Sequence, residues 1–174
     1  MVNGAAGGVG SFAVQLAKQR GCEVTGTCSS EKVEFVKSIG ADHVIDYKET
    51  DFTKNGEQYD AIIDTAMNRK LRDHMDSLAP DGHFAMVGGD NIIGAMFTAM
   101  RISNKKGKQF TAVTNMEPNP AKMENLGELM ATGQIVPTID KRFPLEDAAD
   151  AMKHLIDRKV RGKVVITMSS ANEK

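Results

Sequence analysis

The sequence has few cysteines, no long apolar run and almost no net charge, and each of these absences narrows what the protein can be. Cys22 and Cys28 are its only cysteines, and both fall in one segment that reads as extended, which separates them too far for a disulfide. A membrane or secretory route is not expected, because the sequence contains neither a run of about 18 apolar residues nor a signal-peptide pattern. The net charge of -1 provides no broad basic field for nucleic acid or a membrane surface. We therefore expect a soluble, cytoplasmic protein.

The histidines and cysteines also lack the spacing of a metal site. Neither cysteine belongs to a Cys-x-x-Cys pair, and the histidines are scattered along the chain at His43, His74, His83 and His154. We predict no zinc site and no other metal centre.

The hydrophobic pattern alternates between strand and helix along the whole chain. With 174 residues, the chain has the size of one ordinary domain. Helical periodicity occurs at 12–17, 30–39 and 68–78, after Asn119-Pro120, and again after Pro144. Segments that read as strands are 1–3, 23–27, 43–45, 59–65, 83–87 and 108–113, and an apolar strand at 163–167 is expected to close the fold. This alternation predicts an α/β fold, a doubly wound, mostly parallel six-stranded sheet with helices on both faces.

A glycine-rich turn, Gly4-Ala5-Ala6-Gly7-Gly8-Val9-Gly10, joins the first strand to the first helix. Residues without bulk let backbone N–H groups approach a pyrophosphate, and the positive end of the following helix points at its oxygens. A simple tight turn would explain the glycines alone. The strand before, the helix after and a second strand at the expected distance favour dinucleotide binding through Ala6, Gly7, Gly8 and Val9.

Other nucleotide-binding folds fit the sequence less well. A P-loop requires Gly-Lys-Ser/Thr, whereas Gly10 is followed by Ser11-Phe12. Methyltransferases that bind S-adenosylmethionine usually carry an acid after the second strand, where Cys28 stands. Neither Tyr47 nor Tyr59 has a lysine four residues later, so the Tyr-x-x-x-Lys pair of short-chain dehydrogenases is absent.

The end of the second strand predicts which dinucleotide is bound. An acid there would bind the ribose of NAD and repel the extra phosphate of NADP, and the sequence has none at that position. Ser29, Ser30 and Lys32 instead offer hydroxyls and an ammonium to a phosphate. Taken alone, Ser30 is equally well explained as a helix cap and Lys32 as a solvated side chain.

Several motifs in order resemble one family over essentially the whole chain, the quinone oxidoreductase-like branch of the medium-chain dehydrogenase/reductase superfamily, in the zinc-type alcohol dehydrogenase group. The resemblance rests on Val2-Asn3-Gly4-Ala5-Ala6-Gly7-Gly8-Val9-Gly10, Ser29-Ser30-Glu31-Lys32, Gly40-Ala41-Asp42-His43-Val44-Ile45-Asp46-Tyr47, Phe143-Pro144-Leu145-Glu146-Asp147-Ala148-Ala149 and Arg161-Gly162-Lys163-Val164-Val165.

This resemblance implies a six-stranded Rossmann domain that binds NADP(H). It implies that Lys32 and Tyr47 meet the ribose 2′-phosphate, and that Lys163 lies near the pyrophosphate, although an exposed strand start would also explain Lys163. It also implies that backbone after the fifth and sixth strands contacts the nicotinamide end of the cofactor. In this sequence that backbone corresponds to Gly88, Gly89, Ala112 and Val113.

Family members normally carry an N-terminal, chaperonin-10-like catalytic domain, and this chain begins at the first Rossmann strand. We therefore expect residues 1–174 to be the NADP(H)-binding domain of an oxidoreductase that transfers hydride to a quinone, activated alkene or carbonyl substrate. We identify no catalytic residue and expect little turnover from the chain alone. The alternative is a non-catalytic nucleotide-binding or assembly module.

The resemblance also implies an assembly. Family members commonly dimerise by pairing the edge strands of two sheets, and Lys108 to Val113 is the predicted edge strand here. Apolar surface is expected around Phe143 and Met168, where the missing domain would pack.

Overall fold

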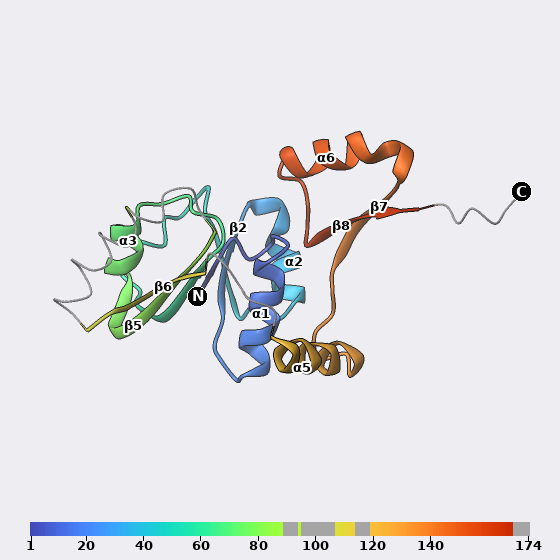
Figure 1. The fold of residues 1–174 in the computed structure, drawn as a ribbon. Coiled ribbons are helices and arrows are strands. Elements are labelled where there is room, and N and C mark those ends of the chain that lie inside the picture. Colours follow the sequence, from blue (N-terminus) through green and yellow to red (C-terminus); the bar gives the residue numbers. More distant parts are fainter. Residues whose placement is uncertain (89–93, 95–106, 114–118, 169–174) are drawn as a thin grey trace, which may run out of the picture.

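The structure is a computed structural model that describes residues 1–88, 94, 107–113 and 119–168. Strands and helices alternate along it (Figure 1). Its described strands are β1 (Val2–Asn3), β2 (Thr25–Cys28), β3 (His43–Asp46), β4 (Tyr59–Asp64), β5 (Leu78–Val87), β6 (Gln109–Val113), β7 (Ile139–Pro144) and β8 (Lys163–Thr167). The described helices are α1 (Gly10–Gln19), α2 (Val33–Ser38), α3 (Leu71–Asp76), α5 (Pro120–Ala131) and α6 (Ala148–Ile156), with 3-10 turns η1 (Ser30–Lys32) and η2 (Leu145–Asp147).

Six strands form one sheet in the order β3-β2-β1-β4-β5-β6, and each neighbouring pair is parallel. The chain first builds outward from β1 to β3, then crosses back and builds from β4 to β6. The order therefore reverses between β1 and β4, which is the topological switch point of a doubly wound sheet. The predicted α/β class, the six strands and their parallel direction are confirmed.

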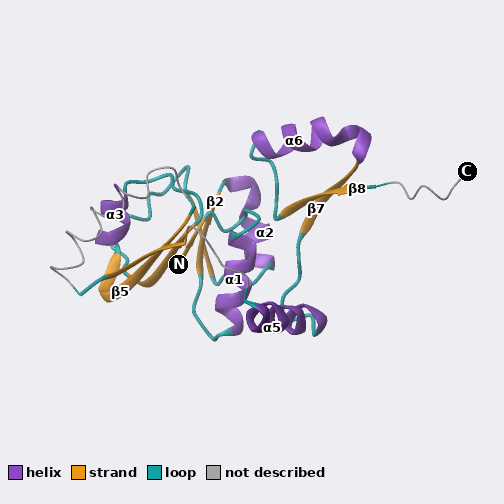
Figure 2. Ribbon diagram, in the orientation of Figure 1, coloured by secondary structure: helices purple, strands orange, loops and turns teal. Residues whose placement is uncertain are grey.

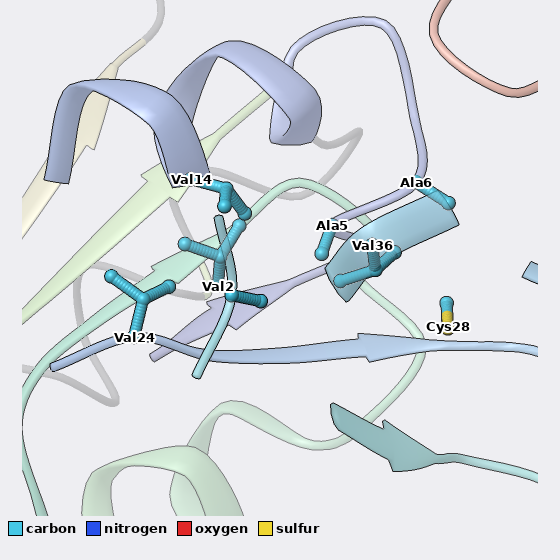
Figure 3. Packing of buried hydrophobic residues seen from close by; sticks show 8 residues of the cluster. Val2, Ala5, Ala6, Val14, Val24, Cys28 and Val36 are labelled. Carbon is cyan, nitrogen blue, oxygen red and sulfur yellow. The ribbon is translucent and has the colours of Figure 1, made fainter. Parts of the chain in front are cut away.

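One face of the sheet packs against α1 and α2. Val2, Val14, Val24 and Val36 meet there with small residues, including Ala5 (Figure 3). Gly26 of β2 is part of this contact, because a Cβ there would lie 2.7 Å from the Val36 side chain. Only glycine therefore lets the two layers approach this closely.

The opposite face packs against α3. Side chains alternate along a strand, so Asn3 points away from the face that holds Val2. The core on this side is built around Ile62, Met75 and Phe84, and the Phe84 and Phe110 rings stack with centroids 5.9 Å apart. The helices thus cover both faces, as predicted.

The last strand, β8, has the bounds that the sequence predicts. β8 does not join the six-stranded sheet; it pairs in parallel with β7 as a separate two-stranded sheet. Figure 2 shows these two strands and α6 set apart from the six-stranded sheet. β7 is not evident from the sequence, because Lys141 and Arg142 interrupt its apolar pattern, and both are exposed. A strand exposed to this extent has no apolar period to detect.

The predicted ends of other elements differ in part. The helix expected at 68–78 spans only Leu71–Asp76, and the strand expected from His83 begins at Leu78. Pro80, Asp81 and Gly82 are typical turn residues, and although they lie within β5, Asp81 has φ +59 and the register with β4 shifts between Tyr59 and Ala61. Tyr59 pairs with Leu78 and Ala61 with His83, so a step of two residues along β4 lies opposite a step of five along β5, and the segment bulges out of the ladder.

Two helix ends follow the sequence closely. The Asn119 side chain accepts a hydrogen bond from the Lys122 amide at 3.1 Å, and Pro120 occupies the first turn of α5. Gly40 has φ +106 directly after α2, as expected for a glycine that ends a helix. Within the ranges that the structure describes, no helix is both long and apolar enough to span a membrane.

Candidate functional site

The glycine turn leaves the sheet at the switch point between β1 and β4. Gly4 has φ +83, and its amide donates to Thr27 Oγ1 at 3.0 Å. A Cβ at Gly10 would overlap the carbonyl oxygen of Gly4, so the first turn of α1 packs directly against the end of β1. Glycine at this position therefore lets helix and strand pack closely.

Within this turn, Gly7 and Val9 are exposed, Gly8 is half-buried and Ala6 is buried. The Gly7 amide donates to the Gly4 carbonyl at 3.0 Å, and the Gly7 carbonyl accepts from Ser11 at 2.9 Å. The turn therefore places small residues at the surface immediately before the N-terminus of α1, where backbone can approach an anion closely.

The start of β8 lies against the glycine turn. The Gly162 amide donates to the Ala6 carbonyl at 2.9 Å, and a Cβ at Gly8 would lie 3.0 Å from Lys163 Nζ. That ammonium also lies 5.7 Å from the centroid of the Phe12 ring. The structure thus brings Lys163 to the turn across the length of the chain, although the backbone of Lys163 is also the exposed start of a strand.

The segment after β2 does not have the helix cap that the sequence suggests at Ser30. Ser29, rather than Ser30, precedes η1, and Ser29 Oγ donates to Glu31 Oε1 at 2.7 Å instead of capping a backbone amide. The helix-cap explanation of Ser30 is therefore wrong. Ser30 itself is exposed.

Lys32 is buried, so the interpretation of Lys32 as a solvated side chain is also wrong. Its Nζ donates to the carbonyls of Arg158 at 2.5 Å and Val160 at 2.9 Å. Burial lowers the pKa of the Lys32 ammonium. Two of the three N–H bonds are thus used to hold the loop between α6 and β8, and one is left to point elsewhere.

Tyr47 and Lys48 follow β3 at the same edge of the sheet. Cys28 pairs with Asp46 in the ladder, and the Tyr47 amide donates to the Cys28 carbonyl at 3.0 Å. Tyr47 is 37% exposed, and Lys48 Nζ lies 3.3 Å from Glu31 Oε2. The ends of β2 and β3 therefore gather the predicted Ser29, Lys32 and Tyr47 near two residues that the sequence analysis did not assign, Glu31 and Lys48.

At the other side of the switch point, the Gly88 amide donates to the Val113 carbonyl at 3.3 Å. The predicted Gly88, Ala112 and Val113 thus lie together at the carboxyl ends of β5 and β6, while Gly89 lies outside the described residues. Gly88 and Val113 offer backbone and an apolar surface, without an acid or base of their own.

A buried polar network beneath the turn was missed by sequence reasoning. Thr27 Oγ1 donates to Asn3 Oδ1 at 2.6 Å, and Asn3 Nδ2 donates to Asp64 Oδ1 at 2.8 Å. Asp64 Oδ2 lies 3.2 Å from His74 Nε2, and both side chains are 1% exposed. The only sequence signal was an asparagine in an otherwise apolar first strand, next to the glycine turn.

Comparison with known proteins places this geometry in a family. Residues 39–166 match the family model described as zinc-binding dehydrogenase. The chain belongs to the zinc-binding dehydrogenase family. It is 34% identical over 172 residues to a chloroplast envelope quinone oxidoreductase homolog of Arabidopsis thaliana, covering 95% of this chain and 51% of that protein. It is 31% identical over 185 residues to trans-enoyl reductase pgmF of Aspergillus terreus, covering 99% of this chain and 52% of the relative.

Solved structures agree with this placement. The quinone oxidoreductase from Coxiella burnetii superposes with a TM-score of 0.82 at 29% identity, over 95% of this chain and 51% of that one. The quinone oxidoreductase-like, medium-chain dehydrogenase resemblance and the Rossmann-type sheet are therefore confirmed. The chain spans about half the length of the relatives it matches.

The family description names zinc, which His, Cys, Asp and Glu side chains bind in proteins. In the part of the chain that the structure describes, no group of three or more His, Cys, Asp or Glu side chains could hold a metal ion. All four histidines lie beside other partners: His43 beside Glu23, His74 beside Asp64, His83 beside Thr111 and His154 beside Asp140.

Proposed function

We propose that this chain binds a nicotinamide dinucleotide, with preference for NADP(H), as the cofactor-binding part of an oxidoreductase. The substrate class we propose is a quinone, activated alkene or carbonyl compound. The observation that supports it is the convergence of the glycine turn, the segment after β2 and Lys163 at the switch point of a doubly wound sheet. Such a crevice is where open α/β sheets bind nucleotides.

In this proposal the pyrophosphate lies on Gly7, Gly8 and Val9 at the start of α1, with the Lys163 ammonium beside it. The adenosine ribose lies at the ends of β2 and β3, near Ser29 and Tyr47. The nicotinamide lies toward Gly88 and Val113, where the described surface is backbone and apolar. The bound cofactor supplies the hydride, and the protein holds and orients the cofactor.

We further propose that catalysis needs a second domain. The unit formed by β7, β8 and α6 exposes many large apolar side chains, namely Leu145, Met152, Leu155, Ile156, Ile166 and Met168. An exposed apolar surface of this kind is typical of a contact with another domain or chain. Phe143, expected to be part of it, is half-buried and 6.2 Å from the His154 ring, centroid to centroid.

A non-catalytic dinucleotide-binding module is the second candidate. It is kept because the chain spans about half the length of the relatives it matches, so the oxidoreductase activity of those proteins is a proposal for this chain. Both candidates predict that the chain binds a dinucleotide. They differ in whether a protein in which this chain is joined to a catalytic domain reduces a quinone. For the compartment we keep the cytoplasm as the proposal, while some relatives are described as chloroplastic or mitochondrial.

The test is calorimetric titration of the chain with NADPH and NADH, together with thermal unfolding in their presence. A ligand that binds only the folded state raises Tm, by an amount that grows with its concentration over Kd. We expect binding of both cofactors, a larger rise with NADPH, and almost no turnover of quinone. Absence of binding by either cofactor would disprove the function, whereas a larger rise with NADH would disprove only the preference.

A further inference from the structure

The Glu31 carboxylate already occupies two donors that a phosphate group would use. Ser29 Oγ donates to Glu31 Oε1 at 2.7 Å, and Lys48 Nζ approaches Glu31 Oε2 at 3.3 Å. One oxygen is thus held by a hydroxyl and the other by an ammonium. A hydroxyl and an ammonium are also the donors that proteins offer to a phosphate monoester.

These two donors come from neighbouring strand ends. Ser29 follows β2 and is buried, whereas Lys48 follows β3 and is exposed. Both lie at the carboxyl edge, where the ribose of a dinucleotide lies in a doubly wound fold. Hydrogen bonds from the backbone N–H of Glu31 and from the Ser29 hydroxyl lower the pKa of the Glu31 carboxyl to about 2. The carboxylate is therefore an anion throughout the neutral pH range.

The neighbouring ammonium of Lys32 is less able to respond to a ligand. It is buried, and its two bonds to the carbonyls of Arg158 and Val160 would have to break before it could move. Lys48 and Glu31 are each about half exposed, with 54% of each side chain accessible, so they can change rotamer without disturbing packing. An exposed ion pair of this kind contributes little to stability, which makes it easy to exchange.

We propose that Glu31 is an internal competitor for the 2′-phosphate of NADP(H), and that Lys48 is the ammonium over which the two anions compete. The inference rests on the proposed function and names the residues that set cofactor preference within it. When NADPH binds, its 2′-phosphate replaces the carboxylate on Ser29 Oγ and Lys48 Nζ. When NADH binds, the carboxylate keeps both donors and accepts a ribose hydroxyl. Glu31 thus reduces the difference in affinity between NADPH and NADH that the Ser29 and Lys48 side chains create.

The experiment compares the whole chain with its Glu31→Gln, Glu31→Ala and Lys48→Gln variants. Calorimetry gives Kd for NADPH, for NADH, and for 2′,5′-ADP, a probe that carries the 2′-phosphate without the nicotinamide. We expect Glu31→Gln to tighten NADPH and 2′,5′-ADP by about three- to fivefold, and Glu31→Ala by at least as much. NADH should be unchanged or slightly weakened. Lys48→Gln should weaken NADPH and 2′,5′-ADP and leave NADH unchanged.

The matched control is Glu34→Gln. Glu34 pairs with Lys37 at 3.0 Å on α2, one turn farther along the chain, and its replacement changes the net charge by the same amount. It should leave all three dissociation constants unchanged, which separates local competition from a general gain in anion binding. Circular dichroism confirms that each variant is folded.

Four outcomes overturn the inference. NADPH binding that is unchanged or weaker in Glu31→Gln would show that the carboxylate does not compete. Equal tightening by Glu31→Gln and Glu34→Gln would show a general charge effect. The parent chain could bind both cofactors while the Kd for NADPH stays the same in the Glu31 and Lys48 variants. That result would leave the proposed function standing and place the phosphate elsewhere. Absence of all binding by the parent chain would overturn both.

Discussion

Thr27 and Gly4 are joined by a hydrogen bond in which the buried threonine hydroxyl accepts from the first amide of the glycine turn, at 3.0 Å. The same hydroxyl donates its own hydrogen to Asn3 Oδ1 at 2.6 Å. One side chain of β2 therefore fixes both the end of β1 and the shape of the turn. Through Asn3, the turn is also connected to the buried carboxylate of Asp64.

Thr27→Val tests this connection. Valine fills nearly the same volume, but it leaves the Gly4 amide and Asn3 Oδ1 without their partner in a buried site. We expect a loss of about 1 to 3 kcal/mol in the free energy of unfolding, measured with urea. Both cofactors should bind more weakly by similar factors, because the turn holds their shared pyrophosphate. Thr25→Val, two residues earlier on β2, is the control and should behave like the parent chain; an equal loss there would show a general intolerance of β2.

Gly10 and Gly7 separate structural from binding roles within one turn. A Cβ at Gly10 would overlap backbone of Gly4 and Ala5, whereas a Cβ at Gly7 would contact only the Gly4 carbonyl, at 3.3 Å. Gly10→Ala should therefore unfold the protein or lower its Tm severely. Gly7→Ala should remain folded and lose most of its cofactor affinity, since Gly7 is exposed where a pyrophosphate would lie. A folded Gly7→Ala variant with unchanged affinity would remove the turn from the binding site.

Lys32→Met tests the loop between α6 and β8. Methionine keeps the apolar stem, but the carbonyls of Arg158 and Val160 lose a charged donor. We expect a loss of about 1.5 to 3 kcal/mol in unfolding free energy and faster proteolysis near residue 160. The ratio of the dissociation constants of NADPH and NADH then shows whether the remaining N–H also meets a phosphate. Lys37→Met, an exposed lysine on α2, is the control and should change neither stability nor the ratio.

Cys22 and Cys28 should differ in reactivity. Burial raises the pKa of the Cys28 thiol to about 11, with the Asp46 carboxylate contributing, whereas Cys22 is exposed. At pH 7.5 only about one Cys28 side chain in three thousand is a thiolate, and the thiolate is the reactive form. A disulfide reagent such as DTNB should modify one thiol per chain rapidly and the second only on unfolding. Cys22→Ser removes the rapid phase, and rapid modification of that variant would contradict the burial of Cys28.

The sheet edge at β6 predicts a dimer, and its backbone directions give a clean test. Val113 accepts from Gly88 and therefore faces β5, so the N–H and carbonyl of Ala112 point outward. Ala112→Pro removes an outward donor without breaking the β5–β6 ladder. Light scattering should show a dimer for the parent chain and a monomer for this variant. A dimer that tolerates proline would move the interface to the apolar surface of β7, β8 and α6, and a monomeric parent would exclude the assembly.

The sequence by itself determined the order of strands and helices in the first half, the parallel sheet, the glycine turn and the family. Local sequence patterns indicate these features: the periodicity of apolar residues, helix caps such as Asn119, and glycines at positions where two backbone segments pack closely. Such signals need only a few neighbouring residues to act, so they can be read without the fold.

The tertiary structure alone decided what each polar side chain does. Lys32 and Glu31 are adjacent in the sequence. The Lys32 ammonium is buried and donates to the carbonyls of Arg158 and Val160, whereas the Glu31 carboxylate is exposed and contacts Ser29 and Lys48. The sequence also did not indicate that β7 and β8 form their own sheet, or that Asn3, Asp64 and His74 meet beneath the turn. The contacts of Glu31 with Lys48, Asn3 with Asp64 and Lys32 with Val160 join residues 17, 61 and 128 positions apart, and a hydrogen-bond partner at that separation is set by packing rather than by local pattern.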